Sequence, residues 1–289
     1  MKPLLPAAEA VALARAGEAT FVDASWFLPG VERDGNEEYA KERITGARRF
    51  DFDELSDTTS SLPHMLPPAE VFESWARTNG VSNETPIVVY ATKDCFSSPR
   101  VWWTFKAFQH AGDVSILDGG LEGWKAAGGE VETGAPASPA ASLYTCTGLN
   151  DKLVVSSEDV LQVMMTGSAQ ICDARPPARF AGEVDEPRPC LARGHIPGSL
   201  NVPFASLLEE DDKTTFLPPI QIRAKMHKAG VIPGSRVIVT CGSGVTACTL
   251  AFSLALLGQP PELAPVYDGS WADWGRPDLD HLPKMIKED

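Results

Sequence analysis

The sequence is poor in positive charge. Its 289 residues include 25 Lys and Arg against 39 Asp and Glu, which gives a formal net charge of −14 and a pI near 4.8. Nucleic acids and anionic membrane surfaces attract proteins through Lys and Arg, so this balance argues against both as partners. No apolar run reaches the length of a membrane span, and the longest, 247–257, is typical of a core helix because Cys, Thr and Ser interrupt it.

Closely spaced cysteines are also missing. The six cysteines stand far apart, at positions 95, 146, 172, 190, 241 and 248, without a C-x-x-C pair. This spacing argues against a disulfide framework and against a zinc site, so we expect no metal, reduced thiols and a cytoplasmic location. The N-terminus, with Pro3, Pro6 and Glu9, lacks the pattern of a signal or transit peptide.

What the chain does contain is an internal repeat. The matching segments are 22–24 with 172–174, 44–47 with 196–199, 79–81 with 229–231, 87–90 with 237–240, and 118–124 with 268–274. Solenoid repeats have periods of roughly 20–50 residues, so this much longer period indicates two copies of a whole domain. A stretch rich in Gly, Ala, Pro and Ser separates the copies. We therefore predict an N-terminal domain at 1–128, a linker at 129–150 and a C-terminal domain at 151–289.

Within each copy, short apolar segments alternate with helical ones. The predicted strands are 21–24, 87–90, 114–117, 170–173, 237–240 and 264–267, and the predicted helices are 8–16, 68–79, 99–110, 157–165, 219–229 and 245–257. This alternation predicts an α/β fold, with a parallel sheet flanked by helices in each domain. Ligands of such sheets bind beyond the carboxyl ends of the strands.

The stretch Cys241–Ala247 lies at such a strand end. Its sequence is Cys-Gly-Ser-Gly-Val-Thr-Ala, after a β-branched run and before a helical one. Gly242 and Gly244 let the backbone curl, so that its N–H groups face an anion at the positive end of the next helix. A thiol in such a place ionises more readily than its usual pKa of about 8.5 allows. The alternative is a buried structural cysteine.

These features together resemble the tandem rhodanese family over nearly the whole chain. The resemblance lies in the two copies, the segment 193–199 (Arg-Gly-His-Ile-Pro-Gly-Ser), the cysteine loop and the segment 268–271 (Asp-Gly-Ser-Trp). The loop is similar to that of 3-mercaptopyruvate sulfurtransferases in particular. Rhodaneses specific for thiosulfate tend to carry basic residues after the cysteine, and this loop has none. Such cations would suit a compact dianion like thiosulfate.

The resemblance also assigns the remaining site residues. In the first copy Ala91 stands where the second has Cys241, so the first is expected to be catalytically degenerate. The family pattern places Asp53 and His64 in a relay with Ser243, in which Asp53 orients His64 and His64 polarises the serine. The alternative is a turn aspartate and an exposed loop histidine.

Two arginines complete the predicted site. Arg179 and Arg188 resemble the carboxylate-binding pair of the family, and guanidinium groups bind carboxylates bidentately. The alternative is that both neutralise the acidic residues between them. The loop amides of Gly242, Gly244, Val245, Thr246 and Ala247 are the predicted anion cradle.

The function that this resemblance implies is a sulfurtransferase without cofactor. It would move sulfur from 3-mercaptopyruvate through a Cys241 persulfide to thioredoxin, a small thiol or cyanide. Thiosulfate as donor and a non-catalytic sulfur-carrier module remain alternatives. A cysteine-dependent phosphatase would need an arginine that closes the loop, and the sequence has none there.

Overall fold

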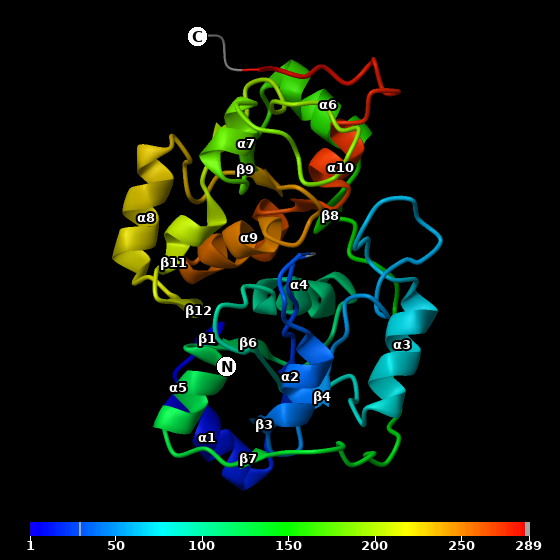
Figure 1. Ribbon diagram of the computed structural model, residues 1–289, viewed down its shortest axis with the longest axis vertical. Coiled ribbons are helices and arrows are strands. Elements are labelled where there is room, and N and C mark those ends of the chain that lie inside the picture. The colour runs from blue at the N-terminus through cyan, green and yellow to red at the C-terminus, as the bar shows by residue number, and fades with distance from the viewer. Residues whose placement is uncertain (29, 287–289) are drawn as a thin grey trace. The chain divides into compact units, whose positions relative to one another are not determined.

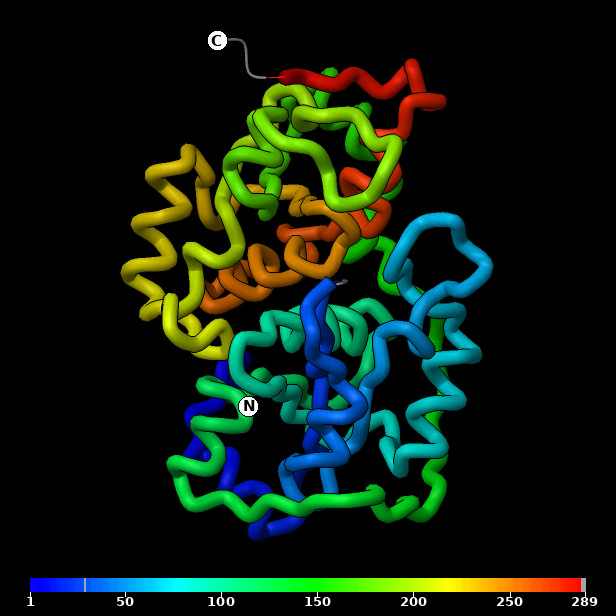
Figure 2. The backbone as a smooth tube through the Cα atoms, viewed as in Figure 1, coloured from blue at the N-terminus to red at the C-terminus, as the bar shows by residue number. Residues whose placement is uncertain are grey.

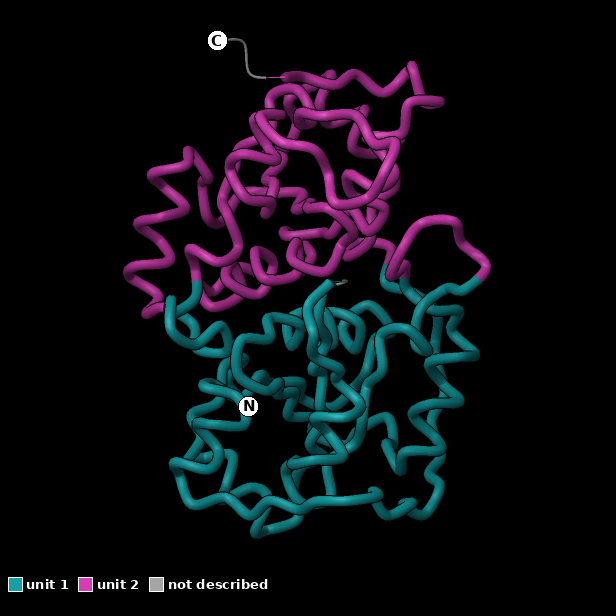
Figure 3. Tube along the Cα trace, in the orientation of Figure 1, with its two compact units in different colours: residues 1–58, 66–150, 208–216 teal, residues 59–65, 151–207, 217–289 magenta. Residues whose placement is uncertain are grey.

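The computed structural model describes residues 1–28 and 30–286 (Figure 2). Contacts within the chain divide it into two compact units (Figure 3). Unit 1 comprises Met1–Thr58, Leu66–Asn150 and Leu208–Phe216, and unit 2 comprises Thr59–Met65, Asp151–Leu207 and Leu217–Asp289.

Unit 1 is built on a parallel five-stranded sheet of order β1-β6-β5-β2-β4 (Figure 1). Its strands are β1 (Leu4–Leu5), β2 (Thr20–Asp23), β4 (Arg48–Arg49), β5 (Ile87–Tyr90) and β6 (Val114–Leu117), and its helices are α1 (Ala7–Ala16), α2 (Gly35–Lys41), α3 (Ala69–Thr78), α4 (Ser98–Ala107) and α5 (Gly120–Ala126). Two small antiparallel pairs join β3 (Arg43–Ile44) to β7 (Val131–Glu132), and β11 (Leu208–Glu209) to β12 (Asp212–Phe216).

Unit 2 repeats this plan. Its parallel sheet has the order β8-β14-β13-β9-β10, the same order with each strand replaced by its counterpart. The strands are β8 (Val154–Val155), β9 (Gln170–Asp173), β10 (Leu200–Asn201), β13 (Val237–Thr240) and β14 (Val266–Tyr267). The helices are α6 (Ser157–Thr166), α7 (Pro177–Ala181), α8 (Pro219–Lys228), α9 (Ala247–Leu256) and α10 (Ser270–Trp274), with 3₁₀ turns η1 (Phe204–Leu207) and η2 (Pro261–Leu263).

The central strands are buried on both faces, as in most parallel sheets. All four residues of β5 and all four of β13 are buried. On one face of unit 1, Val88 and Tyr90 pack with Val11 of α1 and Trp124 of α5. In unit 2 the corresponding cluster joins Ile238 to residues of α6 and α10. The predicted α/β fold, with a parallel sheet and flanking helices in each copy, is therefore confirmed.

The predicted elements agree with the structure to within a few residues. Strands 87–90, 114–117, 170–173 and 237–240 are found with the predicted bounds. The last strand is shorter than predicted because it begins only after Pro265, which has no N–H for the sheet ladder. The short edge strands β1, β4, β8 and β10 and the β11–β12 hairpin were not predicted, since segments of two to five residues carry no clear periodicity.

The register of the central strands in unit 2 positions the candidate site. Thr240 of β13 pairs with Asp173 of β9, so both strands end side by side at one edge of the sheet. The loop after β9 leads to α7, and the loop after β13 begins with Cys241. Side chains from these two loops therefore meet above the same edge.

Candidate active site

Cys241 opens the loop 241–246, which joins β13 to α9. The N–H groups of Trp271 and Ala272 in α10 donate to the carbonyls of Cys241 (3.0 Å) and Gly242 (2.9 Å). Cys241 is buried, with 2% of its surface exposed. The thiol therefore sits on a backbone segment that a neighbouring helix holds in place.

The hydroxyl of Ser270 also holds this loop. Its oxygen accepts hydrogen bonds from the N–H groups of Cys241 and Gly244, each at 3.1 Å. Its proton is donated to the carbonyl of Tyr267 at 2.8 Å. One serine hydroxyl at the start of α10 thus binds two amides of the cysteine loop.

The other amides of the loop have no acceptor in the part of the chain that the structure describes. Among residues 1–28 and 30–286, nothing accepts a hydrogen bond from the N–H groups of Gly242, Ser243, Val245, Thr246 or Ala247. The last of these belong to the first turn of α9, where unpaired N–H groups are normal. Because the helix dipole adds positive potential at the same point, the loop is suited to an anion.

The two glycines of the loop serve different purposes. Gly244 has a φ of +78°, a conformation that glycine adopts without penalty, as expected. Gly242 does not have a positive φ, so the expectation that it curls the backbone is wrong in that respect. A Cβ at Gly242 would lie 2.8 Å from Nη2 of Arg179. A side chain there would displace the guanidinium, which lies directly against the backbone.

Arg179 is held against the loop by a chain of alternating charges. Its guanidinium pairs with Glu186, with Nε 3.2 Å from Oε1. Glu186 also accepts from Arg175 at 2.8 Å, and Arg175 pairs in turn with Asp173 at the end of β9 at 2.7 Å. Arg175, Asp173 and Glu186 are all buried. The sheet edge thereby fixes the position of Arg179.

Arg188 has no carboxylate within ion-pair distance among the residues that the structure describes, although the charge of Glu186 acts on it from further away. Within residues 1–28 and 30–286, no ion pair or hydrogen bond joins its guanidinium to another group. Burial lowers the pKa of Arg188, the negative charge of Cys241 opposes this shift, and Arg179 adds to it. The guanidinium is therefore within electrostatic range of the thiol. The alternative interpretation, neutralisation of the intervening acids, describes Arg179, which pairs with Glu186, and it stays open for Arg188, on which the charge of Glu186 also acts.

His64 lies beside Ser243. Its Nδ1 is 3.4 Å from the serine Oγ, a long hydrogen bond between two residues of unit 2. His64 has a φ of +57°, so its backbone adopts the left-handed conformation that residues with a Cβ rarely take. Asp53 is an exposed residue of unit 1. The pKa of the Asp53 carboxyl is raised, first by partial desolvation of the carboxyl and second by the negative charge of Asp51. Its partnership with His64 stays a prediction.

Sequence reasoning missed the supporting residues of this site. Ser270 was noted only as part of a family motif, and Glu186 only as one of several acids between the arginines. A serine hydroxyl gives no periodic signal, and its partners lie 26 and 29 residues away in the sequence. His195 has packing contacts, because it stacks on Phe180 with ring centroids 4.0 Å apart.

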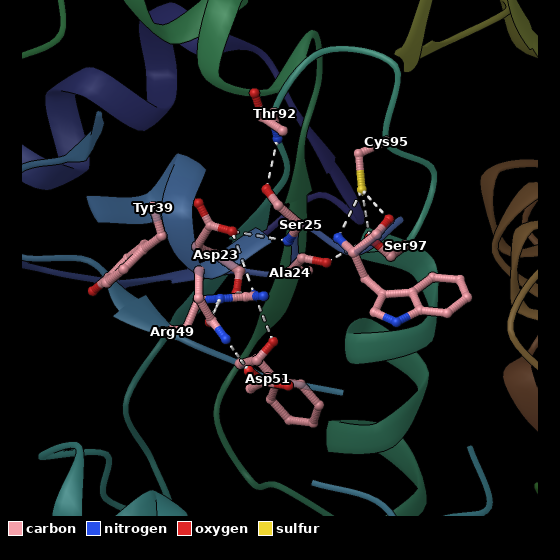
Figure 4. Close-up of polar contacts among 12 residues, drawn as sticks. Asp23, Ala24, Ser25, Tyr39, Arg49, Asp51, Thr92, Cys95 and Ser97 are labelled. Carbon is pink, nitrogen blue, oxygen red and sulfur yellow. Dashed lines mark hydrogen bonds and ion pairs between the residues drawn. The ribbon is translucent and has the colours of Figure 1, made fainter. Parts of the chain in front are cut away.

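In the corresponding loop of unit 1, side chains within the unit make hydrogen bonds to the loop (Figure 4). Ala91 replaces the cysteine there. The thiol four residues later, Cys95, is buried between the Trp26 N–H (3.1 Å), the Trp26 carbonyl (3.0 Å) and the Ser97 hydroxyl (2.9 Å). Burial raises the pKa of Cys95. This thiol has the environment of a structural cysteine.

Across residues 1–28 and 30–286, no cluster of three or more His, Cys, Asp or Glu side chains could hold a metal ion. In the same residues, all six cysteines are free of disulfides. A search of these residues also finds no helix with the length and apolar character needed to span a membrane.

Comparison with known proteins places this geometry in a family. The model of the rhodanese-like domain matches the chain twice, at residues 7–127 and 156–276. The chain belongs to the rhodanese family. Each match contains four of the five strands of one sheet, so the predicted tandem rhodanese architecture is confirmed.

Individual relatives of this rhodanese are similar along almost their full length. It is 44% identical to the 3-mercaptopyruvate sulfurtransferase of Escherichia coli (strain K12), covering 91% of each chain. It is 38% identical to the thiosulfate sulfurtransferase of Rattus norvegicus, covering 93% of this chain and 89% of the rat protein. The crystal structure of SseA from Escherichia coli, a 3-mercaptopyruvate sulfotransferase, superposes with a TM-score of 0.81 at 38% identity, covering 94% of this chain and 99% of SseA. The chain is accordingly a sulfurtransferase of this family.

Proposed function

We propose that this rhodanese transfers sulfur from 3-mercaptopyruvate, through a persulfide on Cys241, to a thiol or cyanide acceptor. The observation that carries the proposal is the arrangement of the two arginines. Arg179 lies against the backbone of Gly242, and Arg188, which has no ion pair among the described residues, is within electrostatic range of Cys241. A donor with an anionic carboxylate a few bonds from its sulfur fits a thiol flanked by guanidinium groups.

The first half-reaction breaks the carbon–sulfur bond of the donor. The Cys241 thiolate attacks the donor sulfur, a disulfide bond forms, and the bonding electrons leave with carbon as the enolate of pyruvate. The adjacent carbonyl stabilises this enolate, and one proton converts it to pyruvate. In the proposed relay this proton comes through Ser243 and His64, with Asp53 orienting the imidazole.

The amides of the cysteine loop support the same step. Those of Gly242, Ser243, Val245, Thr246 and Ala247 have no acceptor among the described residues. Donors aimed at the outer sulfur would stabilise the negative charge of the persulfide without reorganisation. Gly244 contributes through its conformation, because its own N–H is bound by Ser270.

In the second half-reaction an acceptor attacks the outer sulfur and restores the Cys241 thiolate. We propose thioredoxin, a small thiol or cyanide as acceptors, with ping-pong kinetics and no cofactor. The six free cysteines are compatible with a reducing compartment, so we propose the cytoplasm as the location.

Thiosulfate is a second candidate donor. The 38% identity to the rat thiosulfate sulfurtransferase favours it. The absence of Lys or Arg from 242–247 weighs against it, since a compact dianion gains from cations at the loop. The ratio of kcat/KM for the two donors separates the candidates.

A sulfur-trapping experiment tests the proposal directly. The reduced protein is incubated with 3-mercaptopyruvate or thiosulfate, added sulfur is located by intact and peptide mass analysis, and pyruvate is measured in a single turnover. We expect one added sulfur on Cys241 and one equivalent of pyruvate with 3-mercaptopyruvate. Sulfur on Cys241 from thiosulfate alone, with sulfite released in place of pyruvate, would indicate the second candidate donor instead. No added sulfur on Cys241 from either donor would contradict the proposal.

A further inference from the structure

The start of α10 contains a serine in an unfavourable backbone conformation. Ser270 has a φ of +51°, in the left-handed region that residues with a Cβ rarely adopt. The matching residue of unit 1, Gly120, has a φ of +52°. The fold therefore requires this conformation in both units, and glycine is the residue that meets it without cost.

Only unit 2 replaces this glycine with a residue that has a side chain. In unit 1 a Cβ at Gly120 would lie 2.3 Å from the carbonyl oxygen of Ala91, so a side chain there would force the loop to move. The unit with the reactive-type cysteine loop keeps a serine despite the conformational penalty. A strained residue that persists indicates a role for its side chain.

The contacts of the Ser270 hydroxyl show what that role is. A serine hydroxyl has one proton and two lone pairs. The proton goes to the carbonyl of Tyr267, and the lone pairs accept the N–H groups of Cys241 and Gly244. The hydroxyl is fully buried, and its bonding capacity is used up. It therefore has no proton left to donate to sulfur.

We propose that Ser270 is a positioning residue that gives the cysteine loop its anion-binding shape. By binding the first and fourth amides of the loop, it closes residues 241–244 into a turn. The amides of Gly242 and Ser243 lie between these anchors and have no acceptor among the described residues. Without the hydroxyl, the buried amides of Cys241 and Gly244 lose their acceptor, and the turn reopens to pair them elsewhere.

This inference rests on the proposed function only in taking Cys241 as the reactive thiol. Its consequence is that removal of the Ser270 hydroxyl changes the pH dependence of Cys241 alkylation, although the hydroxyl is committed to other groups. A merely structural serine would affect thermal stability and leave this titration unchanged.

The test is the pH dependence of Cys241 alkylation by iodoacetamide in the absence of any sulfur donor, with the labelled peptide identified by mass analysis. The variants are Ser270→Ala, which keeps the Cβ, and Ser270→Gly, which adopts a φ of +51° freely and so does not depend on a strained backbone to fold. The control is Ser253→Ala, which removes another fully buried serine of unit 2 whose hydroxyl has no hydrogen-bond partner.

We expect both Ser270 variants to move the midpoint of alkylation up by about one pH unit. We also expect kcat/KM to fall by about tenfold or more, as for other losses of alignment. Ser253→Ala should keep the midpoint of the unsubstituted protein. A low midpoint that stays unchanged in both Ser270 variants would overturn the inference alone. An ordinary thiol midpoint in the unsubstituted protein would overturn both this inference and the anion cradle of the proposed function.

Discussion

The loops 91–97 and 241–246 follow equivalent strands of the two units, yet their backbone amides differ in their hydrogen-bond acceptors. Both loops anchor a carbonyl in the same way, because Ala91 accepts from the Leu121 N–H and Cys241 from the Trp271 N–H, each at 3.0 Å. Both also pass through a left-handed residue at the matching position, Asp94 in unit 1 and Gly244 in unit 2.

The difference lies in the acceptors around each loop. In unit 1 the N–H of Thr92 donates to the Ser25 hydroxyl at 2.9 Å. In unit 2 the matching amide is that of Gly242, and the residue matching Ser25 is Arg175, whose side chain has only donors. The amide at this position therefore has a side-chain acceptor in unit 1 and none among the described residues in unit 2. Divergence of a repeated fold needs only a change in the hydrogen-bonding side chains near one loop.

The strongest way to break this comparison is to exchange the thiols. Cys241→Ser should reduce sulfur transfer from 3-mercaptopyruvate by at least about 10⁴-fold, because the hydroxyl is a much weaker nucleophile at neutral pH. Adding Ala91→Cys to this variant should restore nothing, since the Ser25 hydroxyl binds the Thr92 amide, the counterpart of the Gly242 amide. Pyruvate release measures both. Activity regained by the double variant would show that the acceptors around the loop do not matter.

His64→Ala tests the proposed relay to Ser243. We expect kcat with 3-mercaptopyruvate to fall by roughly 10²-fold, the usual contribution of a positioned proton donor, with a smaller change in KM. Steady-state kinetics across a pH series measures this. Unchanged kcat would remove the proposed relay and leave His64 as a loop residue.

Arg188→Lys tests whether a free guanidinium is what distinguishes the substrate side of unit 2. Lysine keeps the charge but loses bidentate binding, so KM for 3-mercaptopyruvate should rise by about tenfold, near 1.4 kcal/mol, with kcat affected less. Arg193→Lys serves as the control, because Arg193 is exposed and pairs with exposed Asp185. Equal KM values for the Arg188 and Arg193 variants would contradict the assignment.

Buried His110 in unit 1 makes the stability of the protein depend on pH. Burial lowers the pKa of His110 in unit 1 to about 4, where it contacts the Thr85 carbonyl and the Tyr144 hydroxyl. The unfolded chain takes up this proton near pH 6.5, so stability is full above that pH and falls as the pH approaches 4. Between pH 7 and pH 4.5 the loss should be about 2 kcal/mol.

Urea unfolding of the protein and of His110→Gln at both pH values measures this loss. Glutamine does not titrate, so the variant should lose less stability on acidification. An equal pH dependence of the two proteins would show that His110 is not responsible.

The smallest expected effects concern the left-handed residues of the two loops. Gly244→Ala should destabilise the protein by about 1–2 kcal/mol, because alanine resists a φ of +78°. Asp94→Gly should change stability by only about 0.5 kcal/mol. Glycine adopts the left-handed conformation more easily than aspartate, but it also gives the unfolded chain more conformational freedom, and the two effects offset each other. Thermal unfolding compares the two. Equal effects would mean that the loops are not conformationally equivalent.

Much of the molecule could be predicted from local patterns. The 150-residue spacing between Asp23 and Asp173 revealed two copies, and the apolar runs at 87–90 and 237–240 located their central strands. The arginine pair and the cysteine loop were found because each is a compact motif. Edge strands of two residues, such as β1 and β8, leave no pattern strong enough to detect.

The amino-acid sequence thus determined the repeat and the α/β fold and supplied the candidate nucleophile Cys241, because these depend on periodicity and on short contiguous motifs. Tertiary structure alone decided that Gly242 makes room for Arg179, that Glu186 connects two arginines, and that Ser270 binds the loop from 29 residues away. Such contacts depend on which strand ends lie side by side, and that adjacency is a property of the folded sheet rather than of any segment of the chain.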